Sequence, residues 1–361
     1  MKSWVLIVCF ALMGPVCSVS GAEEMPDALG RSYSSDRKDQ SIERAIAYLR
    51  SNQHNDGSIH DNGKNKTAMT ALAIMAMSAV GHQVTDDTPE GRTMSKALDY
   101  VLDSRRMNRE GYFGIDGSRT YGHGIVTLML AEMLGMCTAE QDKLVFSRLR
   151  KAVNLILKAQ KKEKTKYKRE HGGWRYKPNP SLNAYSDISV TIWQVMALRA
   201  ARNAGFEVPA SSIKDAIGYI KRTYRRRYGA FRYSTVAGDP TFNTASMGIM
   251  ALYLLGEPEA SEVKQSLKWL KGKRITLEER FCFYGLYYHS QAMYQVGGER
   301  AAEAREWIEK ALIAKQQKDG SWEAPKEMNH PQEYKAGRVY CTAMATLTLA
   351  VHHHFLPIYQ R

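Results

Sequence analysis

The chain has 361 residues, of which 44% are hydrophobic, so it is long enough to bury a large core. Its formal net charge of +14 and its pI near 9.4 favour an anionic partner, such as an acidic polysaccharide, a diphosphate or a phospholipid headgroup. No segment after the N-terminus reaches about 18 uninterrupted apolar residues, so no transmembrane segment is expected once the N-terminal signal is removed.

The N-terminus has the pattern of an export signal. Lys2 precedes an apolar stretch over residues 4–13, and small residues follow at 20–22. We expect a signal peptide over residues 1–22, cleaved after Ala22, and an N-terminal linker over residues 23–40. The mature protein is then exported, either periplasmic or secreted. Retention of the signal as an anchor is the alternative.

Two kinds of helix alternate along the rest of the chain. The first is amphipathic, with apolar residues at three- and four-residue spacing and charged residues between them. It is predicted at residues 42–52, 94–104, 144–160, 212–224, 263–271 and 302–316. The second is apolar on nearly every face and rich in small residues. It is predicted at residues 67–80, 123–134, 187–204, 244–255, 282–296 and 341–353.

A helix that is apolar on every face must be buried on every face. Six such helices, surrounded by six amphipathic ones, meet that requirement if they form two concentric rings. The sequence therefore predicts an all-α fold, an α/α toroid of six helix-pair repeats over residues 41–361.

A turn with glycine and an aromatic residue joins the outer to the inner helix in most repeats. Examples are NREGYFG from Asn108, EHGGWRY from Glu170, RYGAFRY from Arg227 and QKDGSW from Gln317, and QHNDGSI from Gln53 keeps the glycine. Glycine supplies the positive φ that ends a helix, and the following side chain covers the hydrophobic layer. The fifth repeat has Gly272 without a following aromatic residue, so we expect a looser wall there.

The QKDGSW turn after an amphipathic helix, together with GGWRY, resembles the Gln-Trp repeat of the squalene-hopene cyclase and protein prenyltransferase superfamily. The resemblance extends from about residue 41 to the C-terminus. It implies a terpenoid cyclase-like toroid whose active residues lie near the starts of the inner helices. Pectate-lyase-like and other α/α toroids share this architecture, so the resemblance implies a fold more strongly than an activity.

Class II terpene cyclases protonate an alkene with an Asp-x-Asp-Asp-Thr-Ala motif. Residues 187–198, DISVTIWQVMAL, fall into that frame, with Asp187 first and Ser189 and Val190 at the second and third aspartates. Protonating an alkene requires a strong acid tuned by a neighbouring carboxyl group, and serine does not provide one. Ordinary squalene cyclisation is therefore not expected. Asp187 keeps two interpretations, a functional acid or a helix N-cap.

Protein prenyltransferases hold zinc with an Asp-x-Cys motif at one inner helix and a histidine at the next. The similar frame here contains Arg280, Cys282 and Cys341. A guanidinium does not ligate zinc, so we expect no metal and no other cofactor unless Glu279 or His289 supplies the missing ligand. The resemblance implies that the two cysteines are adjacent. In an oxidising compartment we expect a Cys282–Cys341 disulfide and leave Cys137 free.

Several other residues stand at the starts of inner helices. His123 lies between two glycines that open space around its ring, and it is either a cavity residue or a satisfied structural histidine. The predicted cavity lining is Tyr121, His123, Tyr185, Asp187, Asn243, Cys282, Tyr340 and Cys341. Trp174 and Phe231 are assigned to scaffold packing.

Three functions remain open. The first is binding of a hydrophobic small molecule, an isoprenoid or other lipid, in the central cavity. The second is binding of an acidic polysaccharide or a polysaccharide lyase-type activity, with a basic catalyst such as Arg280. Whichever reaction the protein catalyses, the catalytic candidates are Asp187, His123 and Arg280. The third is a non-catalytic structural or interaction protein of the cell envelope. Nucleic acid is not expected, because the basic runs at 161–169 and 225–227 lack interleaved stacking residues and the chain is exported.

Overall fold

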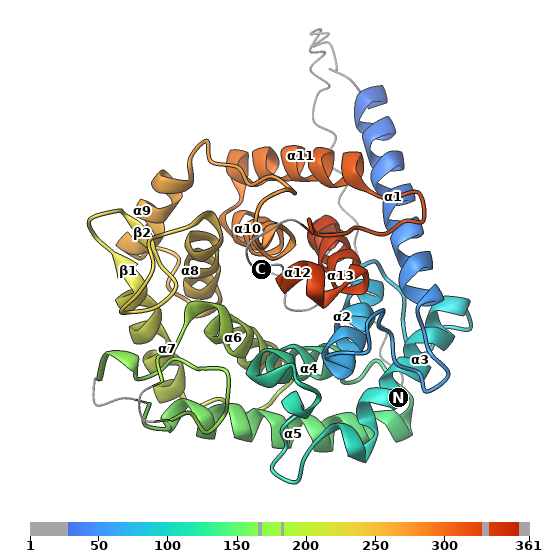
Figure 1. Ribbon diagram of the computed structural model, residues 1–361, viewed down its shortest axis with the longest axis horizontal. Helices are drawn as coiled ribbons and strands as arrows, with labels where there is room; N and C mark the ends of the chain where they lie inside the picture. The colour runs from blue at the N-terminus through green and yellow to red at the C-terminus, as the bar shows by residue number, and fades with distance from the viewer. Residues whose placement is uncertain (1–27, 165–167, 182–183, 327–331, 354–361) are drawn as a thin grey trace, which may run out of the picture.

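The computed structural model describes residues 28–164, 168–181, 184–326 and 332–353. Within them, helices form an outer and an inner ring (Figure 1). The outer ring contains α1 (Ala28–Ser51), α3 (Pro89–Leu102), α5 (Ala139–Lys161), α7 (Ala210–Thr223), α9 (Ser261–Leu270) and α11 (Gly298–Lys315). The inner ring contains α2 (Lys66–Ser78), α4 (Arg119–Met133), α6 (Ile188–Asn203), α8 (Phe242–Leu254), α10 (Cys282–Val296) and α13 (Arg338–Leu349).

The inner ring is closed. Each inner helix contacts the next one along the chain, and α13 contacts α2. Nearly every residue of the inner helices is buried, as their apolar composition requires, while the outer helices bury only one face. The predicted α/α toroid of six helix pairs is therefore confirmed.

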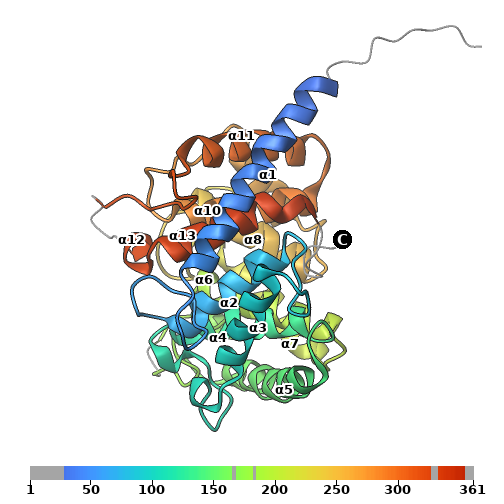
Figure 2. The same cartoon turned by 90° about the vertical axis from the view of Figure 1, so that its right-hand side faces the viewer.

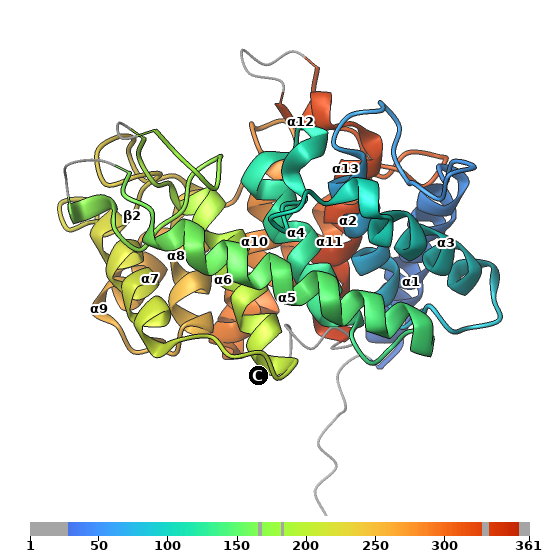
Figure 3. The same ribbon diagram turned by 90° about the horizontal axis from the view of Figure 1, so that it is seen from below.

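Shorter elements lie in the connections. A hairpin of β1 (Tyr224–Arg225) and β2 (Ala230–Phe231) follows α7, and α12 (Gln332–Ala336) precedes α13. Single turns of 3-10 helix form η1 (Ser104–Arg106), η2 (Gly114–Asp116), η3 (Lys168–Glu170) and η4 (Ala350–His353). The hairpin, α12 and the long loops before the inner helices gather at one end of the ring (Figure 3).

The N-terminal region differs from the expectation. Helix α1 begins at Ala28, inside the stretch expected to be a linker, and its first turns project beyond the body of the protein (Figure 2). The apolar period that indicates a packed helix begins only near Ser41, so the polar first half gave no signal. The expected signal peptide lies outside the described residues. Among the described helices, none is long and apolar enough to cross a membrane.

A repeated glutamine at the end of an outer helix fastens three of the turns. Its Nε2 donates to the carbonyl of the turn glycine and to a carbonyl of the next outer helix, at 2.8–3.1 Å. The sets are Gln53 with Gly57 and Thr93, Gln160 with Gly172 and Ser212, and Gln316 with Gly320 and Ser41. The last set joins the end of α11 to α1 and so closes the outer ring across the chain.

The turn glycines pack directly against the next outer helix. Gly320 has φ 87°, and a Cβ there would overlap the carbonyl of Arg44 on α1. Gly229 and Gly272, in the fourth and fifth repeats, have no atom within 4 Å of such a Cβ. The fastening is therefore uneven around the ring, and the close contact of the turn glycine is missing in the fourth and fifth repeats.

Aromatic residues of the turns serve the scaffold. Trp174 is almost fully buried, and its indole Nε1 donates to the carbonyl of Ile156 on α5 at 2.9 Å. Trp322 makes the equivalent bond to Leu312 on α11 at 2.8 Å. Phe231 is fully buried. The packing role expected for Trp174 and Phe231 is confirmed.

The loop before each inner helix also contacts the N-terminal end of the preceding inner helix. The contacts are Thr67 N to Asp116 Oδ2, Thr120 N to the Tyr176 carbonyl, Ile188 N to the Tyr233 carbonyl, Asn243 Nδ2 to the Phe281 carbonyl, Tyr284 N to Glu333 Oε1, and Val339 N to Asp61 Oδ2. All lie between 2.9 and 3.1 Å. This closed series holds the loops against the free amides of the helix ends, where the functional residues were expected.

Candidate functional site

The site is centred on a buried ion pair at the start of α6. Asp187 is the N-cap of this helix and is fully buried. Its Oδ1 accepts from the amide of Val190 at 2.8 Å and from Ser189 Oγ at 2.6 Å, and its Oδ2 accepts from Arg175 Nη1 at 2.6 Å. Both oxygens are therefore engaged, and the N-cap interpretation of Asp187 holds.

Charge and burial shift the pKa values of Asp187 and Arg175 in opposite directions. Burial raises the pKa of Asp187 above its usual value, although hydrogen bonds from Ser189 and Val190 and the charge of Arg175 oppose that rise. Burial also disfavours the charge of Arg175, yet the pKa of this guanidinium is raised because Asp187 and two tyrosines surround it. Arg175 thus remains a cation, and its side chain is 24% exposed.

Tyrosines from several repeats surround the pair. Tyr233 OH accepts from Arg175 Nη1 at 3.1 Å and meets Tyr176 OH at 2.5 Å, while the guanidinium lies 4.0 Å over the Tyr176 ring. Tyr121 OH meets Ser189 Oγ at 2.5 Å, and Tyr284 OH donates to the Ser189 carbonyl at 3.0 Å.

These four tyrosines, Tyr121, Tyr176, Tyr233 and Tyr284, form what we call the tyrosine cluster. All are half-buried, so part of each remains accessible. Burial raises the pKa values of Tyr121, Tyr233 and Tyr284, which keeps these hydroxyls neutral. The site therefore offers neutral hydroxyl groups and aromatic faces around one ion pair.

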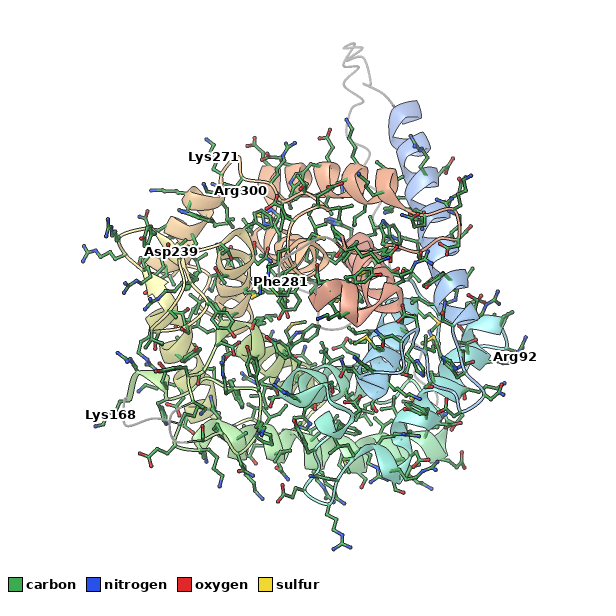
Figure 4. The ribbon with its side chains drawn as sticks, in the orientation of Figure 1. Arg92, Lys168, Asp239, Lys271, Phe281 and Arg300 are labelled. Carbon is green, nitrogen blue, oxygen red and sulfur yellow. The ribbon has the colours of Figure 1, made fainter. Side chains whose placement is uncertain are left out.

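Further into the ring, aromatic side chains meet across the interior. Trp193 on α6 lies with its ring centroid 5.9 Å from that of Tyr287 and 6.0 Å from that of Tyr288, both on α10. All three are almost completely buried, and α8 separates α6 from α10 in the ring. The accessible part of the site is thus at the end where the inner helices begin. Figure 4 shows Phe281 at the inner side of the ring, just before α10.

His123 is placed elsewhere. It is buried, its Nε2 donates to the Ala152 carbonyl on the outer helix α5 at 3.2 Å, and its Nδ1 accepts from the amide of Phe113 at 3.4 Å. Burial lowers its pKa to about 4. The flanking glycines do not open space for the ring, because a Cβ at Gly124 would overlap Gln194 and Trp193. His123 therefore lies against α5, away from the position expected for it.

The other predicted residues are distributed unevenly. Tyr121 and Asp187 are brought together through Ser189, as expected, and Asn243 holds the Phe281 carbonyl. Tyr340 is half-buried in the first turn of α13. Tyr185 is 42% exposed, and Arg280 is an exposed residue whose guanidinium lies 4.5 Å over the Phe281 ring.

Arg175 and Tyr284 were not predicted from the sequence as site residues. The signal for the first was the repeated Arg-Tyr pair, in GGWRY at Arg175-Tyr176 and in AFRY at Arg232-Tyr233. No local pattern marks Tyr284, which reaches Ser189 from a helix two positions away in the ring.

Cys282 and Cys341 are buried free thiols on the neighbouring inner helices α10 and α13. Cys282 Sγ donates to the Leu277 carbonyl at 3.3 Å and to Glu333 Oε2 at 3.7 Å. The expected disulfide is therefore absent from the structure, and the pairing stays a prediction for the exported protein. Cys137 is a half-buried free thiol.

Glu333 is a second buried carboxyl group, and burial raises its pKa to about 7. No cluster of three His, Cys, Asp or Glu residues suited to a metal ion occurs within the described ranges.

No protein-family model matches the sequence, and no curated protein matches it. Solved structures do. A variant of type II terpene cyclase MstE from Scytonema in complex with geranylgeranyl dihydroxybenzoate has a TM-score of 0.58 at 13% identity, covering 90% of this chain and 99% of that chain. Apo MstE has a TM-score of 0.52 at 15% identity, covering 89% of this chain and 100% of that chain. The α-1,6-mannanase of Salegentibacter sp. HEL1_6 has a TM-score of 0.59 at 10% identity, covering 88% of this chain and 98% of that chain.

At these identities the likeness concerns the fold alone. The chain has a terpenoid cyclase-like α/α toroid, which hydrolases of α-mannan also share. Which chemistry the toroid serves must be argued from its own residues.

Proposed function

We propose that this protein is exported and binds an isoprenoid or another hydrophobic ligand with a polar group at the tyrosine cluster. The observation that carries the proposal is the convergence of half-buried tyrosines from four repeats on the Arg175–Asp187 pair and on Ser189, which bonds Asp187. The polar group of the ligand faces Arg175, which is partly exposed, and the apolar part rests on the tyrosine rings.

Binding without proton transfer fits this geometry better than alkene protonation does. Asp187 accepts hydrogen bonds at both oxygens and is paired with a guanidinium at 2.6 Å, an arrangement that favours the ionised form. A catalytic acid for an alkene would need a proton at that carboxyl group. The meeting of Trp193 with Tyr287 also favours a ligand held near the ends of the inner helices rather than a long chain threaded through the ring.

A carbohydrate is the second candidate ligand. The observation in its favour is the number of neutral hydroxyl groups beside a charged pair, because sugars are bound through such donors and acceptors and through aromatic faces. The α/α toroid of a mannanase, crystallised as a variant with α-1,6-mannotriose, gives the same architecture a precedent with glycans. A structural protein of the cell envelope, with its centre filled by the aromatic residues, is the third.

Native mass spectrometry of the exported protein, followed by lipid extraction, tests the proposal. We expect a retained isoprenoid-type lipid in the wild type and at least about a tenfold weaker retention in Tyr284→Phe and Tyr176→Phe, which lose only a hydroxyl group. Tyr185→Phe is the matched control, because Tyr185 is exposed and outside the cluster. Absence of lipid together with binding of α-1,6-mannotriose or of an acidic glycan would reject the first candidate in favour of the second.

Export has a separate test. N-terminal sequencing of the protein recovered from outside the cytoplasm should give Glu23 as the first residue if the signal is cleaved after Ala22. Recovery of the intact N-terminus from the cytoplasm would contradict export.

A further inference from the structure

A second polar pocket lies at the turn between α1 and α2, among residues that take no part in the tyrosine cluster. Its volume is about 270 Å³. Its lining is His54, Asn55, Asp56, Ser58, His60 and Lys66. This lining is wholly polar, so the pocket is not a site for a lipid tail.

Two stacked imidazoles form part of the wall. The ring centroids of His54 and His60 lie 4.0 Å apart with 15° between the planes, and His54 Nε2 donates to the His60 carbonyl at 3.0 Å. His60 is only 6% exposed, and burial lowers its pKa, so the ring is neutral. The pair presents a rigid, flat edge to the pocket.

The protonation of His60 leaves one donor without a partner. Its Nδ1 accepts from the amide of Gly63 at 3.2 Å, so the proton of the neutral ring is on Nε2. Within the described part of the chain, this buried Nε2 has no hydrogen-bond partner. A buried donor left unpaired costs about 1–3 kcal/mol, so His60 is an unsatisfied group in the wall of the pocket.

Both signs of charge line the same pocket. Asp56 Oδ1 accepts from the amide of Ser58 at 3.1 Å and from its Oγ at 2.5 Å, which fixes the carboxylate. Lys66 is the first residue of α2 and forms no ion pair among the residues that the structure describes. Burial opposes the charge of Asp56, but its hydrogen bonds with Ser58 and the charge of Lys66 leave its pKa below the usual value.

We propose that this pocket binds a small polyhydroxylated ligand, a single sugar residue. A simple anion is repelled by Asp56 and a simple cation by Lys66, whereas a hydroxyl group both donates and accepts. Sugar hydroxyls can therefore donate to Asp56 and accept from Lys66 at once. The volume is just below the range of about 300–1,000 Å³ for drug-sized ligands and suits one ring. The proposal does not depend on which ligand the tyrosine cluster holds.

The test follows the histidine side chains directly. Long-range ¹H–¹⁵N spectra of the full chain are recorded while methyl α-mannopyranoside, methyl β-glucopyranoside or sodium phosphate is added. We expect at least one glycoside to shift the His54 and His60 resonances in a saturable way, and phosphate to leave them unchanged. Failure of both glycosides to shift these resonances, or saturable binding of phosphate alone, would overturn the proposal.

Two lysine variants supply the matched comparison. Lys66→Ala should weaken glycoside binding by about tenfold or more, because it removes a charged donor from the pocket. Lys64→Ala should not change it, because Lys64 is an exposed residue of the same loop that does not line the pocket. Thermal unfolding of both variants checks that each is folded. Equal binding by the two folded variants would show that the sugar binds elsewhere.

Discussion

Two buried carboxyl groups at the same end of the inner ring have opposite surroundings. Asp187 caps its own helix, α6, and faces Arg175 at 2.6 Å. Glu333, on α12, caps the neighbouring helix α10 through the amide of Tyr284 at 2.9 Å, and its side-chain partner is the Cys282 thiol. One carboxyl group therefore has a cation beside it, and the other has only neutral donors.

The difference shows what a counter-ion contributes where burial is similar. Burial raises the pKa of both groups, but at Asp187 a guanidinium opposes it. At Glu333 only hydrogen bonds oppose it, and the pKa reaches about 7. Asp187 thus has a guanidinium beside it that stabilises its charged form, whereas Glu333 has none and its pKa lies near neutral.

Removing the counter-ion should have the largest effect. Arg175→Ala leaves the Asp187 carboxylate buried and unpaired, and we expect it to lower the free energy of unfolding by about 3–5 kcal/mol. Arg105→Ala is the matched control, because Arg105 pairs with Asp103 at the same 2.6 Å but at the exposed surface. For Arg105→Ala we expect the free energy of unfolding to fall by at most about 1 kcal/mol. Chemical denaturation measures both, and equal losses would contradict the role assigned to burial.

The charge of Glu333 should make stability depend on pH. Because its folded pKa of about 7 exceeds the ordinary glutamate value of 4.5, the native state binds the proton more tightly than the unfolded state does. This contribution is fully present below about pH 4.5 and is lost as pH rises through about 7, by roughly 3 kcal/mol at most. Glu333→Gln keeps an acceptor for Tyr284 and cannot ionise.

The measurement is the free energy of unfolding of the wild type and of Glu333→Gln between pH 4 and 8. The difference between the two proteins isolates Glu333 from the buried histidines. His123 has a lowered pKa of about 4, so its contribution has the opposite sign and is lost as pH falls below about 6.5. A difference that stays constant over the range would show that Glu333 does not titrate there.

The architecture was predictable from the sequence because it depends on local patterns. Helices that are apolar all round require an inner ring, and a glycine after an outer helix marks the turn that Gln316 and Gly320 fasten. Asp187 could likewise be predicted as an N-cap from its place before an apolar run.

The site was less predictable because its contacts join distant segments. Tyr284 and Ser189 are 95 residues apart, and only the closed ring brings them together. For His123 the sequence left two interpretations open, a cavity residue or a structural histidine. Helical geometry separates them, because a helix turns about 100° per residue and the side chain of His123 therefore points about 200° away from that of Tyr121. Because Tyr121 faces Ser189, His123 faces the outer ring, and helical geometry alone is enough to predict this direction.

The smallest expected effect concerns the thiol beside Glu333. The Cys282 Sγ–H bond lowers the pKa of Glu333, after the larger contributions of burial and of the Tyr284 amide. In Cys282→Ala this donor is lost, and we expect the pH midpoint of the Glu333 contribution to rise by about 0.3–0.7 units, as a weak hydrogen bond of about 0.5–1 kcal/mol allows. Cys137→Ala, whose thiol donates to the Met133 carbonyl, should leave the midpoint unchanged.

Oxidation extends the same experiment to the predicted disulfide. A Cys282–Cys341 bond consumes the Sγ–H donor, so an oxidised protein should titrate like Cys282→Ala, and reduction should restore the lower midpoint. Alkylation of the unfolded, non-reduced protein followed by mass mapping reports the state of both thiols. If both thiols are alkylated in protein recovered from outside the cytoplasm, the disulfide does not form. Cys282 then remains a neutral hydrogen-bond donor to Glu333, whereas the donor beside Asp187 is the charged Arg175.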